Sequence, residues 1–148
     1  MVRLTIGHRP RLKAIPAMAE KYDLVVVLLK DNERAHELLD QYHKCGVNTL
    51  HVPFRVGQML PPMTWDEADH IRHAIKTTAI ALCYDACVFI HCSAGIHRTG
   101  TFTYAVLRRL GETEDEAIAH IHELRPVTAI GMMPFVEWAE DTLVGDDV

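Results

Sequence analysis

The spacing of apolar residues predicts that strands and helices alternate along the chain. Residues 23–29, 48–54 and 86–91 are short apolar runs with the length of buried strands, and residues 2–6 suit a short edge strand. Apolar positions recur with helical spacing in several segments between and after these runs. These segments are residues 12–22, 33–45, 64–84, 101–110, 114–125 and 134–143.

Turn and capping residues mark where several of these helices begin and end. Thr64 with Glu67, and Thr113 with Glu116, have the T-x-x-E pattern of a capping box, so each pair predicts a helix start. Pro126 is expected to end the helix that begins after Thr113. Strands that alternate with helices predict one α/β domain over residues 1–148, with a mainly parallel central sheet flanked by helices on both faces.

Composition narrows the class of protein. The chain has 148 residues, of which 49% are apolar and 24% charged, which is typical of a globular domain. Its longest apolar run is too short to cross a bilayer, and no leader peptide is recognisable, so we expect a cytoplasmic protein without a membrane partner. The net charge of −5 argues against bulk binding of nucleic acid. The histidines show no metal-ligand spacing, so no metal or other cofactor is expected.

Four cysteines occur, and we expect them to be reduced thiols. Cys83 and Cys87 are four residues apart, and we place both on one helix as apolar residues that face the core. A resolving role for either, by disulfide formation with an oxidised Cys92, is the alternative. Cys45 precedes Gly46, a typical helix-ending residue, and carries no functional signal.

Cys92 follows a predicted buried strand and begins a short loop that leads into a helix. The loop is Cys92-Ser93-Ala94-Gly95-Ile96-His97-Arg98. Backbone N–H groups of Ser93 to Arg98 at such a helix start can surround an anion, and Gly95 can adopt a positive φ that a tight loop needs. Arg98 adds a planar pair of donors suited to phosphate oxygens. The loop therefore predicts a phosphate site.

The same donors favour the thiolate form of Cys92, which makes its sulfur a nucleophile facing a bound phosphorus atom. The expected reaction is attack on phosphorus to give a phosphocysteine, followed by hydrolysis. Thr99 can donate its hydroxyl to the sulfur, and His91 is expected to orient the loop. An inert buried thiol is the alternative for Cys92, and the residues in register around it argue against that alternative.

The segment "HCSAGIHRTG" resembles the H-C-x5-R-[ST]-G signature of the protein tyrosine phosphatase superfamily and matches every fixed position. Chain length and the order of the other segments resemble the compact dual-specificity branch, most strongly over residues 88–126. The resemblance implies a cysteine-dependent phosphatase fold, with Cys92 as nucleophile, Arg98 as phosphate clamp and Thr99 assisting the sulfur.

Family members usually carry an aspartate general acid in the loop that corresponds to Arg55–Leu60, and this chain has no carboxylate there. Asp66 or Asp69 could supply the proton, although Asp66 lies in a capping box. His97 is preferred, because imidazole exchanges protons near neutral pH and a related lipid-phosphatase branch carries an acid directly before the loop arginine. A leaving group that needs no acid, or a solvent-facing His97 without a role, are the other readings.

The substrate remains open at the level of sequence. The five variable loop residues include no lysine, which makes a highly charged inositol phosphate less favoured than a phosphotyrosine, phosphoserine or phosphothreonine protein. His8, Arg9 and Arg11 form a surface loop in the simplest interpretation, or steer RNA 5′ phosphates in another. A phosphate-binding module with reduced catalysis is the second class of function. Phe54 and Trp65 are expected to be packing residues. Oligomeric state is not predicted.

Overall fold

A four-stranded parallel sheet forms the centre of the part of the chain described by the computed structural model, residues 2–57 and 63–145. The strands are β1 (Arg3–Gly7), β2 (Leu24–Val27), β3 (Thr49–His51) and β4 (Cys87–His91). Their order in the sheet is β1-β4-β2-β3, so β4 lies between β1 and β2. Register pairs Gly7 of β1 and Val27 of β2 with His91, which brings the carboxyl ends of three strands to one edge.

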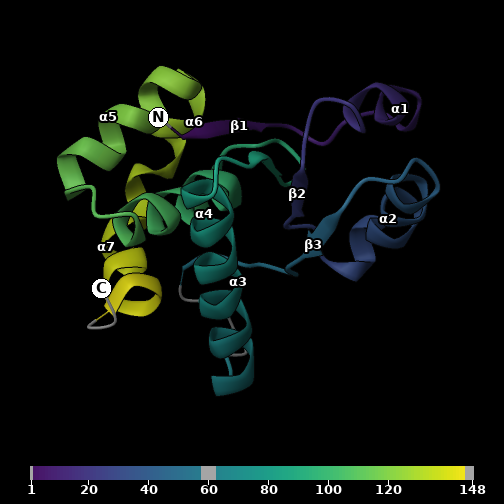
Figure 1. Cartoon of the computed structure of the whole chain (residues 1–148). Coiled ribbons are helices and arrows are strands. Elements are labelled where there is room, and N and C mark those ends of the chain that lie inside the picture. Colours follow the sequence, from purple (N-terminus) through teal and green to yellow (C-terminus); the bar gives the residue numbers. More distant parts are fainter. Residues whose placement is uncertain (1, 58–62, 146–148) are drawn as a thin grey trace.

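Helices cover both faces of the sheet (Figure 1). On one side lie α1 (Ile15–Met18) and α2 (Ala35–Lys44), each preceded by a 3₁₀ turn at Leu12–Ala14 and Asp31–Glu33. On the other side lie α3, α4, α5, α6 and α7. Their bounds are α3 (Trp65–Cys83), α4 (His97–Arg109), α5 (Glu114–Leu124), α6 (Pro126–Met132) and α7 (Val136–Ala139), with a 3₁₀ turn at Met133–Phe135 and a π-helical end at Glu140–Val144. The predicted α/β fold with a parallel sheet is therefore confirmed.

Alternation along the strands explains why there are two cores. Val25 and Val27 of β2 and Phe89 of β4 pack toward α1 and α2, whereas Val26 and Ile90 pack toward the other helices. Successive side chains of a strand point to opposite faces, so nearly continuous apolar runs are what a sheet buried on both faces requires.

Both capping boxes form as the sequence predicts. The side-chain oxygens of Thr64 and Thr113 accept hydrogen bonds from the backbone N–H groups of Glu67 and Glu116, and the two glutamates return the bonds. Pro126 ends α5 and also begins α6, a helix that the sequence interpretation did not include. Proline suits the first turn of a helix, because no N–H partner is needed there.

The placement of Cys83 and Cys87 on one helix was wrong. Cys83 is the exposed last residue of α3, and Cys87 is the half-buried first residue of β4. A turn at Tyr84 and Asp85, in which Asp85 has a φ of 64°, separates the two elements. Trp65 was also expected to pack, yet it is 80% exposed, whereas Phe54 is buried as expected.

Candidate active site

The loop after β4 lies at the edge where the strands end, and its shape depends on Gly95. This glycine has a φ of 74°, and a Cβ placed on it would lie 2.3 Å from the carbonyl carbon and oxygen of Gly7 and 2.6 Å from the His8 nitrogen. Those atoms are backbone and cannot turn aside. A glycine is therefore required both by the backbone conformation and by close contact with the chain that leaves β1.

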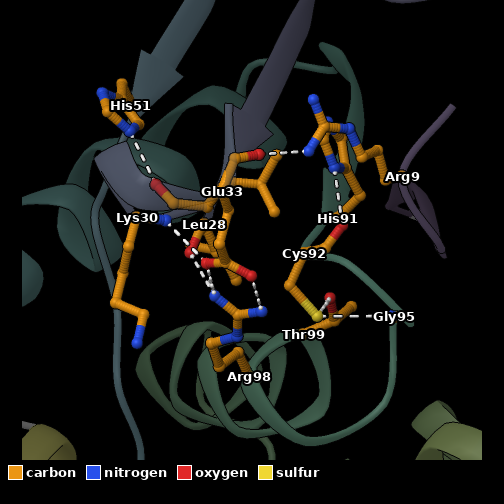
Figure 2. A network of polar contacts seen from close by, with 11 residues as sticks. Arg9, Leu28, Lys30, Glu33, His51, His91, Cys92, Gly95, Arg98 and Thr99 are labelled. Atoms are coloured by element: carbon orange, nitrogen blue, oxygen red, sulfur yellow. Dashed lines mark hydrogen bonds and ion pairs between the residues drawn. The ribbon is translucent and has the colours of Figure 1, made fainter. Parts of the chain in front are cut away.

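Cys92 lies at the base of the loop with only 3% of its surface exposed. Its Sγ accepts a hydrogen bond from Thr99 Oγ1 at 3.0 Å and another from the Gly95 N–H at 3.3 Å. Figure 2 shows both donors directed at the sulfur. Two donors, next to the start of α4, are an arrangement that stabilises a thiolate over a thiol.

Arg98 is held by a carboxylate that the sequence interpretation did not single out. Its Nη1 and Nη2 donate to Glu33 Oε1 and Oε2 at 2.6 and 2.8 Å, and Nη1 also donates to the Leu28 carbonyl at 3.3 Å (Figure 2). Hydrogen bonding to the Arg98 guanidinium lowers the pKa of Glu33 to about 2. The Glu33 carboxylate raises the pKa of Arg98, and the nearby Cys92 sulfur adds to that rise.

The pairing with Glu33 leaves part of the guanidinium available. An arginine side chain has five N–H donors in one plane. Three of them meet Glu33 and Leu28, so the Nε–H and one Nη2–H remain. These two lie on the same edge and form the fork that binds two oxygens of a phosphate. Glu33 thus fixes the plane of Arg98 without occupying the edge that a phosphate needs.

Three residues from other elements hold the outside of the loop. Arg125 Nη1 donates to the Gly95 carbonyl at 2.6 Å and to the Ala94 carbonyl at 3.2 Å, and Thr128 Oγ1 donates to the Gly95 carbonyl at 2.6 Å. On the opposite side, the Arg9 N–H donates to the Ser93 carbonyl at 2.8 Å. Because three successive carbonyls are engaged from outside, the N–H groups of the loop are free to face a ligand.

His91 supports the loop from below and is fully buried. Its Nδ1 is 3.1 Å from the Cys92 carbonyl, which can only accept, so Nδ1 carries the proton and Nε2 accepts from the Tyr42 hydroxyl at 3.0 Å. Burial lowers the pKa of His91 to about 4. The ring is therefore neutral at pH 7, and its contacts fit the orienting role that we expected for it.

His97 begins α4, and its side chain is exposed. Its ring lies 5.4 Å from the ring of Phe135, centroid to centroid, and next to Gly131. Phe135 in turn lies against Gly57, where a Cβ would be 3.3 Å from the phenyl ring. His97 therefore stands near the segment from which family members present their acid, although Gln58–Leu60 of that segment lie outside the described residues.

The two aspartates weighed as acids have different settings. Asp66 is exposed in the first turn of α3. Asp69 lies 3.6 Å from Arg72 and shares a surface pocket with Arg109, the last residue of α4. Arg109 is twelve residues after His97, about 18 Å along the helix. Asp69 is thus next to the end of α4 that lies away from Cys92.

Glu67 and Arg55 form an ion pair close to the acid segment. Arg55 Nε and Nη2 donate to the two oxygens of Glu67, each at 3.2 Å. Glu67 also completes the capping box of α3, and the hydrogen bonds from Thr64 and Arg55 lower its pKa. An ionised carboxylate with these partners is a structural group, so neither residue adds an acid to the site.

Other kinds of site receive no support from the described residues. Within residues 2–57 and 63–145, no three histidines, cysteines or acidic residues gather in a way that could hold a metal ion. Over the same ranges, none of the helices has the length and apolarity that crossing a membrane demands. The four cysteines are all free.

Comparison with known proteins places this geometry in a family. Residues 13–121 match the tyrosine phosphatase family, while comparison with curated protein sequences gives no match. Among solved structures, Tk-PTP in its active form has a TM-score of 0.68 at 23% identity, covering 92% of each chain. PTPMT1 in complex with PI(5)P has a TM-score of 0.65 at 17% identity, covering 94% of this chain and 91% of that one.

The core catalytic domain of the PP-IP phosphatase SIW14 from S. cerevisiae, in complex with citrate, has a TM-score of 0.64 at 18% identity. The match covers 94% of this chain and 82% of that one. At these identities the structures share the fold, and the family match extends over β2, β3, β4, the Cys92 loop and α4. The chain belongs to the tyrosine phosphatase family and has the fold of a cysteine-dependent phosphatase.

Proposed function

We propose that the protein hydrolyses phosphate monoesters of phosphorylated proteins through a phosphocysteine formed on Cys92. The observation that carries the proposal is the arrangement around the sulfur. Sγ is buried and accepts from Thr99 and Gly95, and the plane of Arg98 is fixed by Glu33 with one edge free. A nucleophile, a preformed anion cradle and a phosphate fork thus converge on one point.

In the first step, the Cys92 thiolate attacks phosphorus and an S–P bond forms while the ester P–O bond breaks. The loop N–H groups and the free edge of Arg98 hold the three non-bridging oxygens, on which charge is spread in the transition state. The leaving oxygen needs a proton, and His97 is proposed to donate it. Its exposed ring at the start of α4 next to Phe135 supports this assignment.

In the second step, water attacks phosphorus and the S–P bond breaks, which releases inorganic phosphate. The neutral His97 left by the first step accepts the proton of the water, so protons balance over the cycle. The Thr99 hydroxyl, 3.0 Å from Sγ, stabilises the thiolate as it leaves. No redox reagent or bound metal enters these steps.

Phosphotyrosine, phosphoserine and phosphothreonine proteins are the proposed substrates. The side chains of Ser93, Ala94 and His97 are exposed, so the loop lies open to a protein surface, and the five variable loop residues contain no lysine. The free thiols and the need for a Cys92 thiolate agree with a reducing compartment, which we propose to be the cytoplasm. The relatives bound to PI(5)P or named a PP-IP phosphatase make lipid and inositol phosphates the substrates to compare.

Hydrolysis of p-nitrophenyl phosphate tests the reaction, since its leaving group needs little help from an acid. We expect vanadate-sensitive activity that Cys92→Ser abolishes, and a phosphocysteine trapped by rapid acid quenching. Activity that survives Cys92→Ser, or no activity at all, would contradict the proposal and favour a phosphate-binding module. A panel of phosphotyrosine peptide, phosphoserine peptide, PI(5)P and 5′-triphosphorylated RNA then identifies the substrate class.

The acid is tested with an alkyl phosphate, whose leaving group does require a proton. His97→Ala should lower turnover of phosphoserine peptide about 10²–10⁴-fold and affect p-nitrophenyl phosphate far less. Asp66→Asn is the matched control and should leave both activities unchanged. The opposite pattern, with Asp66→Asn inactive and His97→Ala active, would show that the aspartate is the acid.

A further inference from the structure

A basic pocket lies next to the loop that contains Cys92, on the side of β1. It has a volume of about 560 Å³. Four cations line it, together with two leucines that face the same space and one acidic residue, Glu37. The cations and leucines are Arg9, Arg11, Lys13, Arg34, Leu12 and Leu38. Four positive side chains gathered on a chain with a net charge of −5 are a local reversal of the overall charge.

Two of the four cations are tied by hydrogen bonds. Arg34 Nη2 lies 2.7 Å from Glu37 Oε2, with the arginine side chain 77% exposed. Arg9 donates from Nη1 to the Glu33 carbonyl and from Nη2 to the Arg34 carbonyl at 3.1 Å. The bonds of Arg9 hold Arg34 in the left-handed conformation, with a φ of 62°, which few residues other than glycine adopt.

The other two cations, Arg11 and Lys13, are exposed, and within the described residues neither has an acidic partner. Glu37 can offset one of the four charges, and it is already engaged with Arg34. The pocket therefore presents uncompensated positive charge to solvent, over a floor that includes Leu12 and Leu38. Such a surface suits a ligand that is anionic and partly apolar.

The pocket is continuous with the active site through the chain that leaves β1. Gly7 and His8 pack against Gly95, and the Arg9 N–H donates to the Ser93 carbonyl at 2.8 Å. Arg11 and Lys13 follow two and four residues later. An extended chain advances about 3.3 Å per residue, so these cations lie within about 7 and 13 Å of the residue that touches the loop.

We propose that this pocket binds the acidic residues that flank the phosphorylated residue of a peptide substrate. The inference rests on the proposed function and names the sequence context that the site selects. An extended peptide has the same spacing as the β1 exit segment, so side chains two to four residues from the phosphorylated position reach Arg11 and Lys13. Cations strung along a segment, with leucines between them, fit a peptide better than a compact polyphosphate, which needs donors that converge on one point.

The experiment compares two phosphotyrosine peptides that differ only in their flanks. One carries aspartate or glutamate at the positions two to four residues on each side of the phosphotyrosine, and the other carries asparagine or glutamine there. Wild-type protein should have a kcat/KM about tenfold higher for the acidic peptide, the lower end of what electrostatic steering supplies. The preference should shrink as salt is added, because the cations are exposed.

The variant R11E/K13E should abolish or reverse this preference. The matched control R3E/K76E reverses two exposed charges elsewhere on the surface, changes the net charge equally, and should keep the wild-type preference. Since the result is a ratio of two peptides on one preparation, a loss of folded protein cannot imitate it. A ratio that R11E/K13E leaves unchanged, or that R3E/K76E lowers equally, overturns the inference.

Two further measurements separate this inference from the proposed function. Wild-type protein that fails to hydrolyse p-nitrophenyl phosphate refutes the proposed function, whereas retained hydrolysis without preference between the peptides refutes only the pocket. Inositol hexakisphosphate is added as a competitor. If it inhibits wild type far more than R11E/K13E while the two peptides react equally, the pocket takes a polyphosphorylated small molecule, and the peptide assignment is wrong.

Discussion

The ion pair between Glu33 and Arg98 gives the most informative mutation, Glu33→Gln. The side chains are 25% and 17% exposed, so solvent screens the pair only weakly. A fall in the pKa of Glu33 from 4.5 to about 2 corresponds to about 3 kcal/mol, at about 1.4 kcal/mol for each tenfold change. Glutamine keeps the shape and can accept one hydrogen bond, so we expect a loss of about 2 kcal/mol in the free energy of unfolding at pH 7.

The pH dependence of this loss follows from the direction of the shift. The folded protein holds Glu33 ionised more strongly than the unfolded chain does, so its contribution is fully present above pH 4.5. It is lost as pH falls from 4.5 toward about 2. Urea unfolding of wild type and Glu33→Gln should therefore differ at pH 7 and converge as the solution is acidified below pH 4.5.

Activity should fall together with stability, because Glu33 sets the plane of the arginine that binds phosphate. A displacement of about 1 Å at a positioned group can cost about 10²-fold in rate, so we expect kcat/KM for p-nitrophenyl phosphate to drop about 10- to 100-fold. Glu37→Gln, four residues later, removes a carboxylate that is 42% exposed and should change neither quantity measurably. If Glu33→Gln matched Glu37→Gln in both assays, the positioning role of Glu33 would be refuted.

Three other substitutions test the loop and its supports. Gly95→Ala should cost about 2–4 kcal/mol and abolish activity, because its methyl group would lie 2.3 Å from backbone atoms; Gly111→Ala, also at positive φ but with no atom within 4 Å of the added carbon, should cost about 1 kcal/mol in the same urea titration. Thr99→Val should lower kcat about 10- to 100-fold and enlarge the burst of released alcohol in stopped flow, since phosphocysteine breakdown loses a donor; Thr103→Val removes a buried hydroxyl that has no hydrogen-bond partner and should leave kcat intact. The folded state lowers the pKa of His91 to about 4, so the unfolded chain binds the extra proton first and the free energy of unfolding should fall by up to about 3 kcal/mol between pH 6.5 and 4; an equal slope in His91→Gln would show that other groups cause it.

The features that the sequence predicted are those with a local physical cause. The capping boxes at Thr64 and Thr113 formed because each involves residues three apart. The strand before Cys92, the loop and the helix after it were likewise readable within one segment, as was the positive φ of Gly95. Such contacts depend little on where the rest of the chain lies.

The features that sequence reasoning missed depend on contacts between distant segments. Glu33 is 65 positions from Arg98, and no spacing rule joins them. A signal did exist, because Glu33 follows β2 and therefore lies at the same sheet edge as Cys92. Pro126 was interpreted only as the end of a helix, and α6 with its loop-binding Thr128 was lost as a result.

The strand order β1-β4-β2-β3 has a consequence for how the chain is made. In a protein synthesised from its N-terminus, β2 and β3 can pair early, because they are close in sequence. β1 has no partner until β4 leaves the ribosome, since Arg3 to Gly7 pair only with Cys87 to His91. Parallel pairings over such separations form late. The strand that delivers Cys92 to the site is also the strand for which the emerging sheet must wait.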